Sequence, residues 1–294
     1  MEKSNFVLEK PGWLRKKVSL NNENIHKVKN LLVDLNLHTV CQSAKCPNIF
    51  ECFSKKTATF MLLGDKCTRN CAFCSVSSGK PQAPDKNEPF NIAQAVKELS
   101  LNYTVLTSVT RDDLEDGGAL QFAETVRQIK YLMPETSIEC LTPDFNGNIE
   151  NLNKLLDEKP DVLNHNIETV KRNYKTIRAN SDYRRSLDFL QISKNKRPDI
   201  ITKSGFMLGL GEKKEEIAEL LSDLNKVQCD IVTIGQYLCP GKENFPVKKY
   251  YSPEEFLEIE QIAHGFNFKF VVSGIFVRSS YQAATAFHAA TSGN

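Results

Sequence analysis

The sequence predicts an α/β fold, with an incomplete, open (β/α)6 barrel over residues 57–273. Short β-branched, apolar runs alternate with helical patterns along this segment, and such alternation indicates a parallel sheet with helices outside it. A closed barrel of eight strand–helix units typically takes about 250 residues. Because this segment is shorter and contains six such units, we expect a TIM-like barrel that does not close.

The elements of the barrel follow from the periodicity of the apolar residues. Six runs are expected to be strands: 57–63, 103–109, 137–141, 161–166, 200–208 and 229–235. Helical patterns, with apolar residues at three- and four-residue steps, lie between them at 92–100, 119–133 and 213–227. Residues 1–56 and 274–294 fall outside the alternation. We expect them to form N-terminal and C-terminal extensions that pack on the ends of the barrel.

Composition limits the class of protein. The chain has 294 residues, of which 40% are hydrophobic and 25% charged, as in ordinary globular proteins. Its net charge of +2 argues against a dedicated nucleic-acid binder. No run of eighteen apolar residues predicts a membrane-spanning helix. The first seventeen residues lack the apolar stretch of a secretory signal, so we expect a cytoplasmic protein.

Six of the nine cysteines lie in two triplets between Cys41 and Cys74. In a reducing cytosol, clustered cysteines hold metal more often than they form disulfides. The second triplet, C-x3-C-x2-C at Cys67, Cys71 and Cys74, follows the first predicted strand, where barrels place their chemistry. Three such cysteines can bind three irons of a cubane cluster and leave the fourth iron open to a small molecule. Structural zinc is the alternative, although it usually takes four ligands in two paired hooks.

Polar residues gather directly after several predicted strands. In parallel barrels, the loops at these strand ends build the active site. Asp and Gly at the same positions also cap the helices that follow, so a purely structural role is the alternative. The residues concerned are Arg111, Asp112, Asp113, His165, Asn166, Glu168, Gly209, Gly211, Glu212, Gln236 and Tyr237.

The second triplet, with Phe73 before its last cysteine, resembles the signature of radical S-adenosylmethionine (SAM) enzymes. The resemblance implies that Cys67, Cys71 and Cys74 are catalytic and hold a [4Fe–4S] cluster. In that family, the open iron binds the amino and carboxylate groups of SAM. An electron from the cluster then cleaves SAM to give a 5′-deoxyadenosyl radical. The open barrel expected above is consistent with this family.

Over roughly residues 11–283, the chain resembles the lipoyl synthase family. The motifs that carry this resemblance are "CPNIFECF", "TSVTRDDLEDGGA", "VLNHNIETV", "TKSGFMLGLGE", "DIVTIGQYL" and "RSSY" at 278–281, together with the first triplet, C-x4-C-x5-C. The resemblance implies that Cys41, Cys46 and Cys52 hold an auxiliary [4Fe–4S] cluster, with Ser280 as its fourth, catalytic ligand. A serine oxygen is a harder donor than a thiolate and matches iron less well, so the iron that it binds can leave the cluster more easily. From the residues alone, Ser280 suits a helix N-cap equally well.

The resemblance also implies the reaction of a sulfurtransferase. Two sulfur atoms enter carbons 6 and 8 of an octanoyl chain bound to a lysine of a lipoyl carrier domain, and the auxiliary cluster is consumed as the sulfur source. The implied carriers are 2-oxoacid dehydrogenase acyltransferase subunits and the glycine-cleavage carrier protein. Further implied partners are an electron donor such as ferredoxin or flavodoxin and a cluster-repair protein. We expect a monomer with no membrane or nucleic-acid partner.

The remaining residues give weaker indications. Asn166, Glu168, Gly209 and Gly211 are expected to bind SAM, although the two glycines also suit a strand-to-helix turn that needs positive φ. Cys140 and Cys229 fall in predicted strands and are expected in the core. Two positions depart from the family: Cys239, and Asn244 where His is usual. The basic "LRKK" at 14–17 is typical of a solvated face, and it could also meet an acidic carrier domain.

Two other classes of function compete with this interpretation. An electron carrier would also hold two clusters, but it would need neither a barrel of this size nor an iron left open. A sulfur-inserting radical enzyme that acts on RNA would usually add an RNA-binding domain and a basic surface. This chain is almost neutral.

Overall fold

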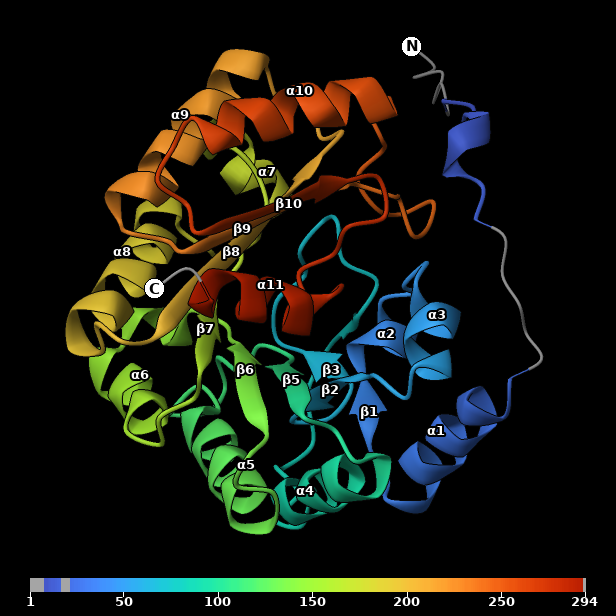
Figure 1. Ribbon diagram of the computed structural model, residues 1–294, viewed down its shortest axis with the longest axis vertical. Helices are drawn as coiled ribbons and strands as arrows, with labels where there is room; N and C mark the ends of the chain where they lie inside the picture. Colours follow the sequence, from blue (N-terminus) through green and yellow to red (C-terminus); the bar gives the residue numbers. More distant parts are fainter. Residues whose placement is uncertain (1–7, 17–21, 293–294) are drawn as a thin grey trace.

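One curved sheet of eight strands forms the centre of the computed structural model, which describes residues 8–16 and 22–292. β1 runs antiparallel to β2, and every other neighbouring pair is parallel. In spatial order the strands are β1 (His38–Thr39), β2 (Thr59–Leu62), β5 (Tyr103–Ser108), β6 (Ser137–Leu141), β7 (Val162–Asn164), β8 (Ile201–Leu208), β9 (Ile231–Gln236) and β10 (Phe270–Gly274). Because β1 and β10 lie at opposite edges, the barrel is open, as predicted (Figure 1).

The six predicted strands are confirmed, and β10 adds a seventh parallel strand that the sequence analysis missed. β10 pairs with β9, with Phe270 opposite Ile231. It is bonded on one side only, and four of its five residues are partly exposed. An edge strand of this kind needs less apolar burial than a central one, which weakens its signal in the sequence.

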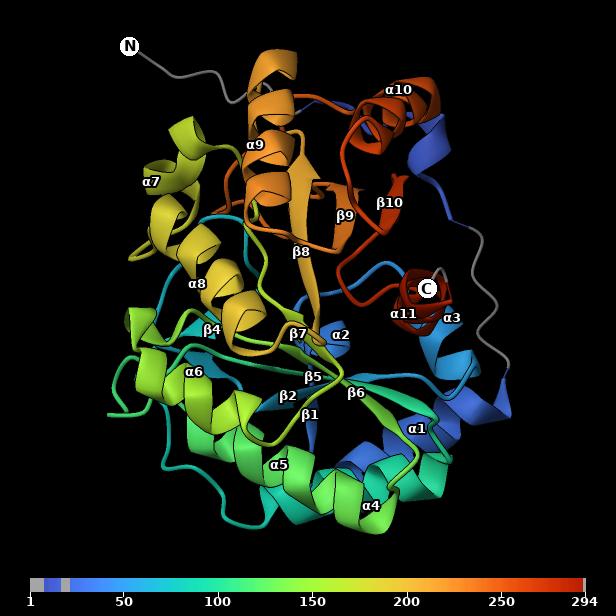
Figure 2. The same ribbon diagram turned by 60° about the vertical axis from the view of Figure 1, so that its left-hand side comes forward.

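Helices cover the outer face of the sheet, where Figure 2 shows them side by side. They are α4 (Glu88–Leu99), α5 (Ala119–Leu132), α6 (Ile149–Leu156), α8 (Tyr183–Lys196), α9 (Lys214–Lys226) and α10 (Pro253–His264). The buried residues of α9 are Ile217, Leu220, Leu221 and Leu224, the stripe expected of an amphipathic helix. Ser252 begins α10 with a capping box, which fixes the start of that helix.

The C-terminal extension runs through the open barrel. After β10, Val277 and Ser279 lie against the inner faces of β9 and β8, where Gly235 and Gly205 leave no room for a side chain. An ideal Cβ on Gly235 would stand 2.2 Å from the Val277 carbonyl oxygen. Glycine at position 235 therefore permits the close approach of Val277, whereas an ideal Cβ on Gly205 would first meet Thr233 Oγ1, at 2.4 Å, and then Ser279 Oγ, at 3.3 Å.

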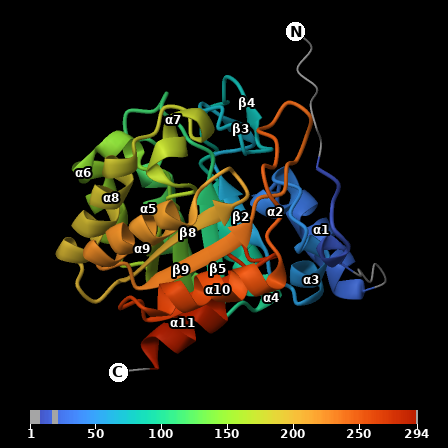
Figure 3. The same cartoon turned by 90° about the horizontal axis from the view of Figure 1, so that it is seen from above.

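The chain then forms α11 (Ala283–Thr291), which covers one end of the barrel. Its Ala286 and Ala290 pack with Val162, Ile201 and Ile231, at the beginnings of β7, β8 and β9. Figure 3 shows α11 at one end of the molecule and the short strands β3 (Lys66–Cys67) and β4 (Ser77–Ser78) at the other. The amino ends of the strands are thus covered, whereas their carboxyl ends face the β3–β4 side.

The N-terminal extension supplies the edge strand β1 and packs beside that edge of the sheet. It contains η1 (Gly12–Leu14), α1 (Glu23–Asp34), α2 (Val40–Ser43) and α3 (Ile49–Ser54). Ile25, Val28, Leu31 and Leu32 of α1 are buried in the same core cluster as β2 and α4. Three further short elements, η2 (Phe145–Gly147), η3 (Lys171–Asn173) and α7 (Tyr174–Ile177), follow β6 and β7.

Candidate active site

A cavity of about 670 Å³ lies at the carboxyl ends of the parallel strands. Its walls include the strand ends Ser108 and Gln236, and α11 lies at the opposite end of the barrel. The structure brings both predicted cysteine triplets and the "RSSY" segment to this one cavity: Cys41, Cys46, Cys52, Cys67, Cys71, Cys74, Arg278, Ser279, Ser280 and Tyr281 all line it. Segments far apart in the chain therefore share one site.

The loop of the second triplet presents its sulfurs to backbone donors. The Cys67 sulfur accepts hydrogen bonds from the N–H groups of Arg69, at 3.4 Å, and of Thr110, at 3.3 Å. The Cys74 sulfur accepts one from Val76 at 3.4 Å. Burial raises the pKa of the Cys71 thiol to about 12, against the opposing charge of a nearby arginine. Backbone donors of this kind stabilise a thiolate once a metal has displaced its proton.

The first triplet is assembled from two helices and the turn between them. Cys41 lies in α2, Cys52 in α3, and Cys46 in the connecting segment, where its N–H donates to the Cys41 carbonyl at 3.0 Å. Burial raises the pKa of Cys41 to about 11. Burial and the neighbouring Cys41 and Cys46 sulfurs raise that of Cys52 to about 12. The three sulfurs are thus close enough to affect one another's ionisation.

All nine cysteines lie in the described residues, and none of them is paired in a disulfide. Within residues 8–16 and 22–292, no three His, Cys, Asp or Glu side chains converge so as to hold a single metal ion. A cubane cluster does not need three side chains to converge on one ion, because each of its irons binds a separate thiolate.

The C-terminal segment makes direct contacts with both sides of the cavity. Ser279 donates from Oγ to Asn166 Oδ1 at 2.8 Å. Asn48, between two cysteines of the first triplet, donates from Nδ2 to the Phe276 carbonyl at 2.7 Å. Ser280 lines the cavity and does not cap α11, whose N-cap residue is Gln282. The N-cap alternative for Ser280 is therefore excluded.

The predicted SAM-binding residues divide into two groups. Asn166 and Glu168 line the cavity, and burial raises the pKa of the Glu168 carboxyl. Gly209 and Gly211 do not line it. Their φ angles are +107° and +90°, and the Gly209 N–H donates to Glu212 Oε1 at 2.6 Å. The structure thus gives the two glycines a strand-to-helix turn beside the cavity wall.

Arg178 is a cavity residue that the sequence analysis did not single out. Its side chain lies among Tyr174, Ser186 and His165, and it donates from Nη1 to Ser186 Oγ at 3.0 Å. It lines the cavity, and its positive charge lowers the pKa values of Cys71 and Glu168 against the effect of burial. Because Arg178 follows a short helix rather than a strand, no strand-end pattern marks it in the sequence.

Of the other residues considered in the sequence, some lie in the buried interior and others at the cavity wall. Cys140 and Cys229 are buried, as expected. Cys239 lines the cavity, and its sulfur lies 3.0 Å from the Gly241 carbonyl oxygen. In the basic segment 14–17, Leu14 and Lys16 line the cavity, whereas position 17 lies outside the described residues. Arg111 pairs with Asp113 at 2.8 Å and is buried.

Comparisons with known proteins agree with the geometry. Residues 61–224 match the radical SAM superfamily, so fold and cavity define a radical SAM enzyme. Residues 1–46 match the N-terminal domain of lipoyl synthase. Lipoyl synthase from Caldicellulosiruptor saccharolyticus is 56% identical over 94% of this chain and 96% of its own length. The lipoyl synthase from Alkaliphilus metalliredigens is 52% identical over 95% and 96%, and that from Bacillus cereus is 50% identical over 96% and 95%. The chain belongs to the lipoyl synthase family.

Solved structures support the fold. Methylornithine synthase superimposes with a TM-score of 0.57 at 15% identity, covering 85% of this chain and 76% of its own. A maturase of the [FeFe]-hydrogenase gives a TM-score of 0.58 at 14% identity, covering 91% and 66%. None of the helices in the described part of the chain combines the length and apolar character needed to cross a bilayer.

Proposed function

We propose that this chain makes the lipoyl group by inserting two sulfur atoms, at carbons 6 and 8, into an octanoyl chain carried on a lysine of a lipoyl carrier domain. It is a sulfurtransferase of the radical SAM class, which uses a [4Fe–4S] cluster and SAM. The observation that carries this function is the meeting of two cysteine triplets and Ser280 at one cavity. A volume of about 670 Å³ is in the range of sites for a cofactor and a small substrate group.

Cys67, Cys71 and Cys74 would hold the cluster that binds SAM. These three cysteines suit a cluster because backbone N–H groups donate to the Cys67 and Cys74 sulfurs and would stabilise them as thiolates. When bound, the cluster and SAM supply the one-electron chemistry that breaks an unactivated C–H bond. The loop would supply three thiolates to such a cluster, and its fourth iron would then have no protein ligand from this loop.

Asn166, Glu168 and Arg178 are proposed to orient SAM. A buried carboxylate such as Glu168 suits the amino group of SAM, and a guanidinium suits its carboxylate. Burial favours the neutral form of Glu168, so binding of an ammonium group would restore its charge. Gly209 and Gly211 are proposed to contribute to SAM binding through the turn that they form after β8.

Cys41, Cys46, Cys52 and Ser280 are proposed as ligands of an auxiliary [4Fe–4S] cluster that donates the sulfur. The three thiols are mutually close, and Ser280 lines the same cavity. A hydroxyl oxygen matches iron less well than a thiolate does, so this ligand suits a corner that must open.

We propose that the chain has three parts, residues 1–56, 57–273 and 274–294. We also propose that the protein is a cytoplasmic monomer. Octanoylated carrier domains follow from the family, whereas the kind of carrier is proposed: 2-oxoacid dehydrogenase acyltransferase subunits and the glycine-cleavage carrier protein. A ferredoxin or flavodoxin as electron donor and a cluster-repair protein complete the proposed partners.

Two substitutions test the separation of roles. Cys74→Ala should abolish formation of 5′-deoxyadenosine and keep the auxiliary iron, because it removes a ligand of the SAM-binding cluster alone. Cys46→Ala should keep 5′-deoxyadenosine formation and abolish lipoyl formation. Iron and sulfide are counted in both variants after anaerobic reconstitution. Normal SAM cleavage by Cys74→Ala would overturn the assignment of the second triplet.

A further inference from the structure

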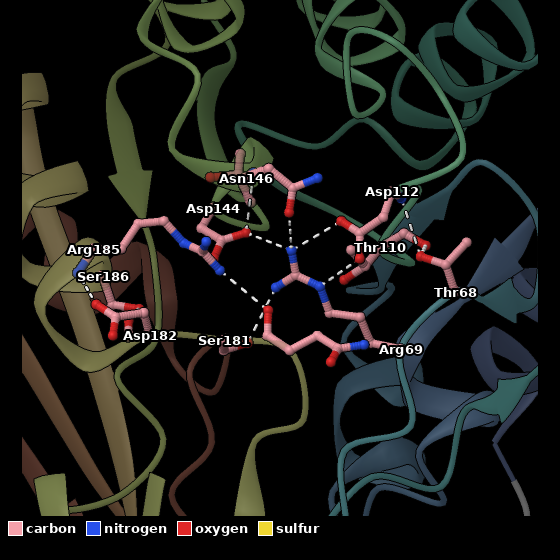
Figure 4. Close-up of polar contacts among 12 residues, drawn as sticks. Thr68, Arg69, Thr110, Asp112, Asp144, Asn146, Ser181, Asp182, Arg185 and Ser186 are labelled. Atoms are coloured by element: carbon pink, nitrogen blue, oxygen red, sulfur yellow. Dashed lines mark hydrogen bonds and ion pairs between the residues drawn. The ribbon is translucent and has the colours of Figure 1, made fainter. Parts of the chain in front are cut away.

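Arg69 stands inside the second cysteine triplet, between Cys67 and Cys71, and its side chain is only 3% exposed. Its guanidinium makes a bidentate contact with Asp112, in which Nε donates to Oδ2 at 2.7 Å and Nη2 donates to Oδ1 at 2.8 Å (Figure 4). Asp112 lies in the loop that follows β5. This contact therefore fastens the cysteine loop to the end of the neighbouring strand.

The same guanidinium reaches two further loops. Asp144 Oδ1 and Asn146 Oδ1, in the loop after β6, each lie 2.8 Å from Nη2, whose two hydrogens are shared among these oxygens and Asp112 Oδ1. Nη1 donates to Ser181 Oγ at 3.1 Å, in the segment that leads into α8. Figure 4 shows these partners arranged around the Arg69 side chain from different directions. One residue of the cysteine loop is thus hydrogen-bonded to three other loops.

The carboxylate at the centre of this network is fully buried. Asp144 is 0% exposed, and its second oxygen accepts a hydrogen bond from Arg185 Nε at 2.8 Å. Burial favours the neutral carboxyl, but the hydrogen bond and charge of Arg69 hold the pKa of Asp144 at about 2. The network is therefore ionised at neutral pH. Breaking a buried, paired arrangement is costly, so it resists movement of the loop.

Lysine could not replace Arg69 in this position. A guanidinium has five donors in a rigid plane, whereas an ammonium is a compact charge on a flexible stem. The Arg69 contacts use three nitrogens and reach Asp112, Asp144 and Ser181 at the same time. Retaining the charge would not retain this geometry.

We infer that Arg69 is a positioning residue that fixes the shape of the cysteine loop independently of any cluster, because each hydrogen bond of its side chain goes to a residue outside that loop. This inference rests on the proposed role of Cys67, Cys71 and Cys74 as cluster ligands. A loop that is already shaped loses less conformational entropy when it binds. Arg69 would thereby favour cluster loading by Cys67, Cys71 and Cys74.

The test uses Arg69→Met, Arg69→Lys and the milder Asp112→Asn, with Arg185→Met as the matched control. Arg185 shares Asp144 with Arg69 but lies in α8, so its loss removes a similar ion pair without touching the cysteine loop. Amide hydrogen exchange of residues 67–76 is measured in the full-length apoprotein. Iron content and the electron paramagnetic resonance spectrum with and without SAM are then measured after reconstitution, in a background where Cys41, Cys46 and Cys52 are alanine.

Arg69→Met and Arg69→Lys should both speed exchange in the loop at least about tenfold, as expected from lost charge-assisted hydrogen bonds. They should also lower iron content and blunt the spectral change caused by SAM. Asp112→Asn should show a smaller change in the same direction. If the Arg69 variants do not fold, the comparison of Asp112→Asn with the wild type tests the inference. Arg185→Met should leave the loop and the spectrum unchanged.

Three results would overturn the inference. Arg69→Met could show the exchange rates and spectra of the wild type, Arg69→Lys could behave like the wild type, or Arg185→Met could lose as much as the Arg69 variants. Failure of the proposed function would look different. If the background protein with intact Arg69 binds no cluster, the ligand assignment fails, yet hydrogen exchange still reports whether Arg69 anchors the loop.

Discussion

Lys16 Nζ lies 2.6 Å from Glu51 Oε2, and this ion pair joins the N-terminal segment to the first cysteine triplet. The same ammonium group donates to Asn48 Oδ1 at 2.6 Å and lies 5.4 and 5.5 Å from the ring centroids of Phe276 and Tyr281. The Tyr281 hydroxyl donates to Glu51 Oε1 at 3.1 Å. Lys16 therefore links three segments around the proposed auxiliary-cluster site.

Lys16→Met should weaken retention of the auxiliary cluster. Loss of the ion pair and of the cation–π contacts should remove roughly 1–2 kcal/mol, enough for about tenfold faster iron loss to a chelator. Formation of 5′-deoxyadenosine should be unchanged, because Lys16 does not contact the second triplet. Lys55→Met is the matched control, since Lys55 also bonds Glu51, at 3.1 Å, but is 65% exposed. Equal iron loss in the control would contradict this role for Lys16.

Asn244, which contacts the second triplet, should support the conformation of that loop. Its Nδ2 donates to the carbonyl oxygens of Cys74 at 2.8 Å and Ala72 at 3.3 Å. Asn244→Ala removes both hydrogen bonds and should raise the KM for SAM several-fold, because the loop loses about 1 kcal/mol per bond. Asn244→His should recover part of this loss, since one ring N–H can reach one carbonyl. The exposed neighbour Glu243 provides the control, Glu243→Ala, and a KM unchanged in Asn244→Ala would reject the role.

His165 should make the protein sensitive to acid. Its Nδ1 lies 2.9 Å from the Thr142 carbonyl oxygen, which can only accept, so Nδ1 carries the proton of a neutral ring. Burial, and then the charge of Arg178, lowers the pKa of His165 to about 3. Because this pKa lies below that of an unfolded histidine, protonation favours unfolding. The stabilisation is complete above about pH 6.5 and falls as pH drops towards 3.

The measurement is urea unfolding of the apoprotein at pH 7 and pH 5. Wild type should lose about 2 kcal/mol more than His165→Gln between these values, since each unit below about 6.5 contributes about 1.4 kcal/mol. Equal losses in the two proteins would show that other groups control the acid response.

The open barrel and the place of the second cysteine triplet after its first strand were predictable, because the patterns that indicate them are local in the sequence. Apolar runs such as 103–109 mark buried strands, and the spacing of Cys67, Cys71 and Cys74 is confined to eight residues. The contacts that hold the site together were not predictable, because they form between distant segments. Nothing near Arg69 in the sequence points to Asp144, and nothing near Lys16 points to Tyr281. Arg178 was missed for the same reason, since its place at the cavity depends on how α7 packs.

We propose that an auxiliary cluster held by Cys41, Cys46 and Cys52 donates the sulfur. Enzyme reconstituted with isotopically labelled sulfide is mixed with SAM, a reductant, an octanoylated carrier and excess unlabelled sulfide, and the lipoyl product of the first turnover is analysed by mass spectrometry. Label should occupy both sulfur positions, and product should stop at about one lipoyl group per chain, because donation dismantles the cluster. A first-turnover product that carries mainly unlabelled sulfur would contradict the claim.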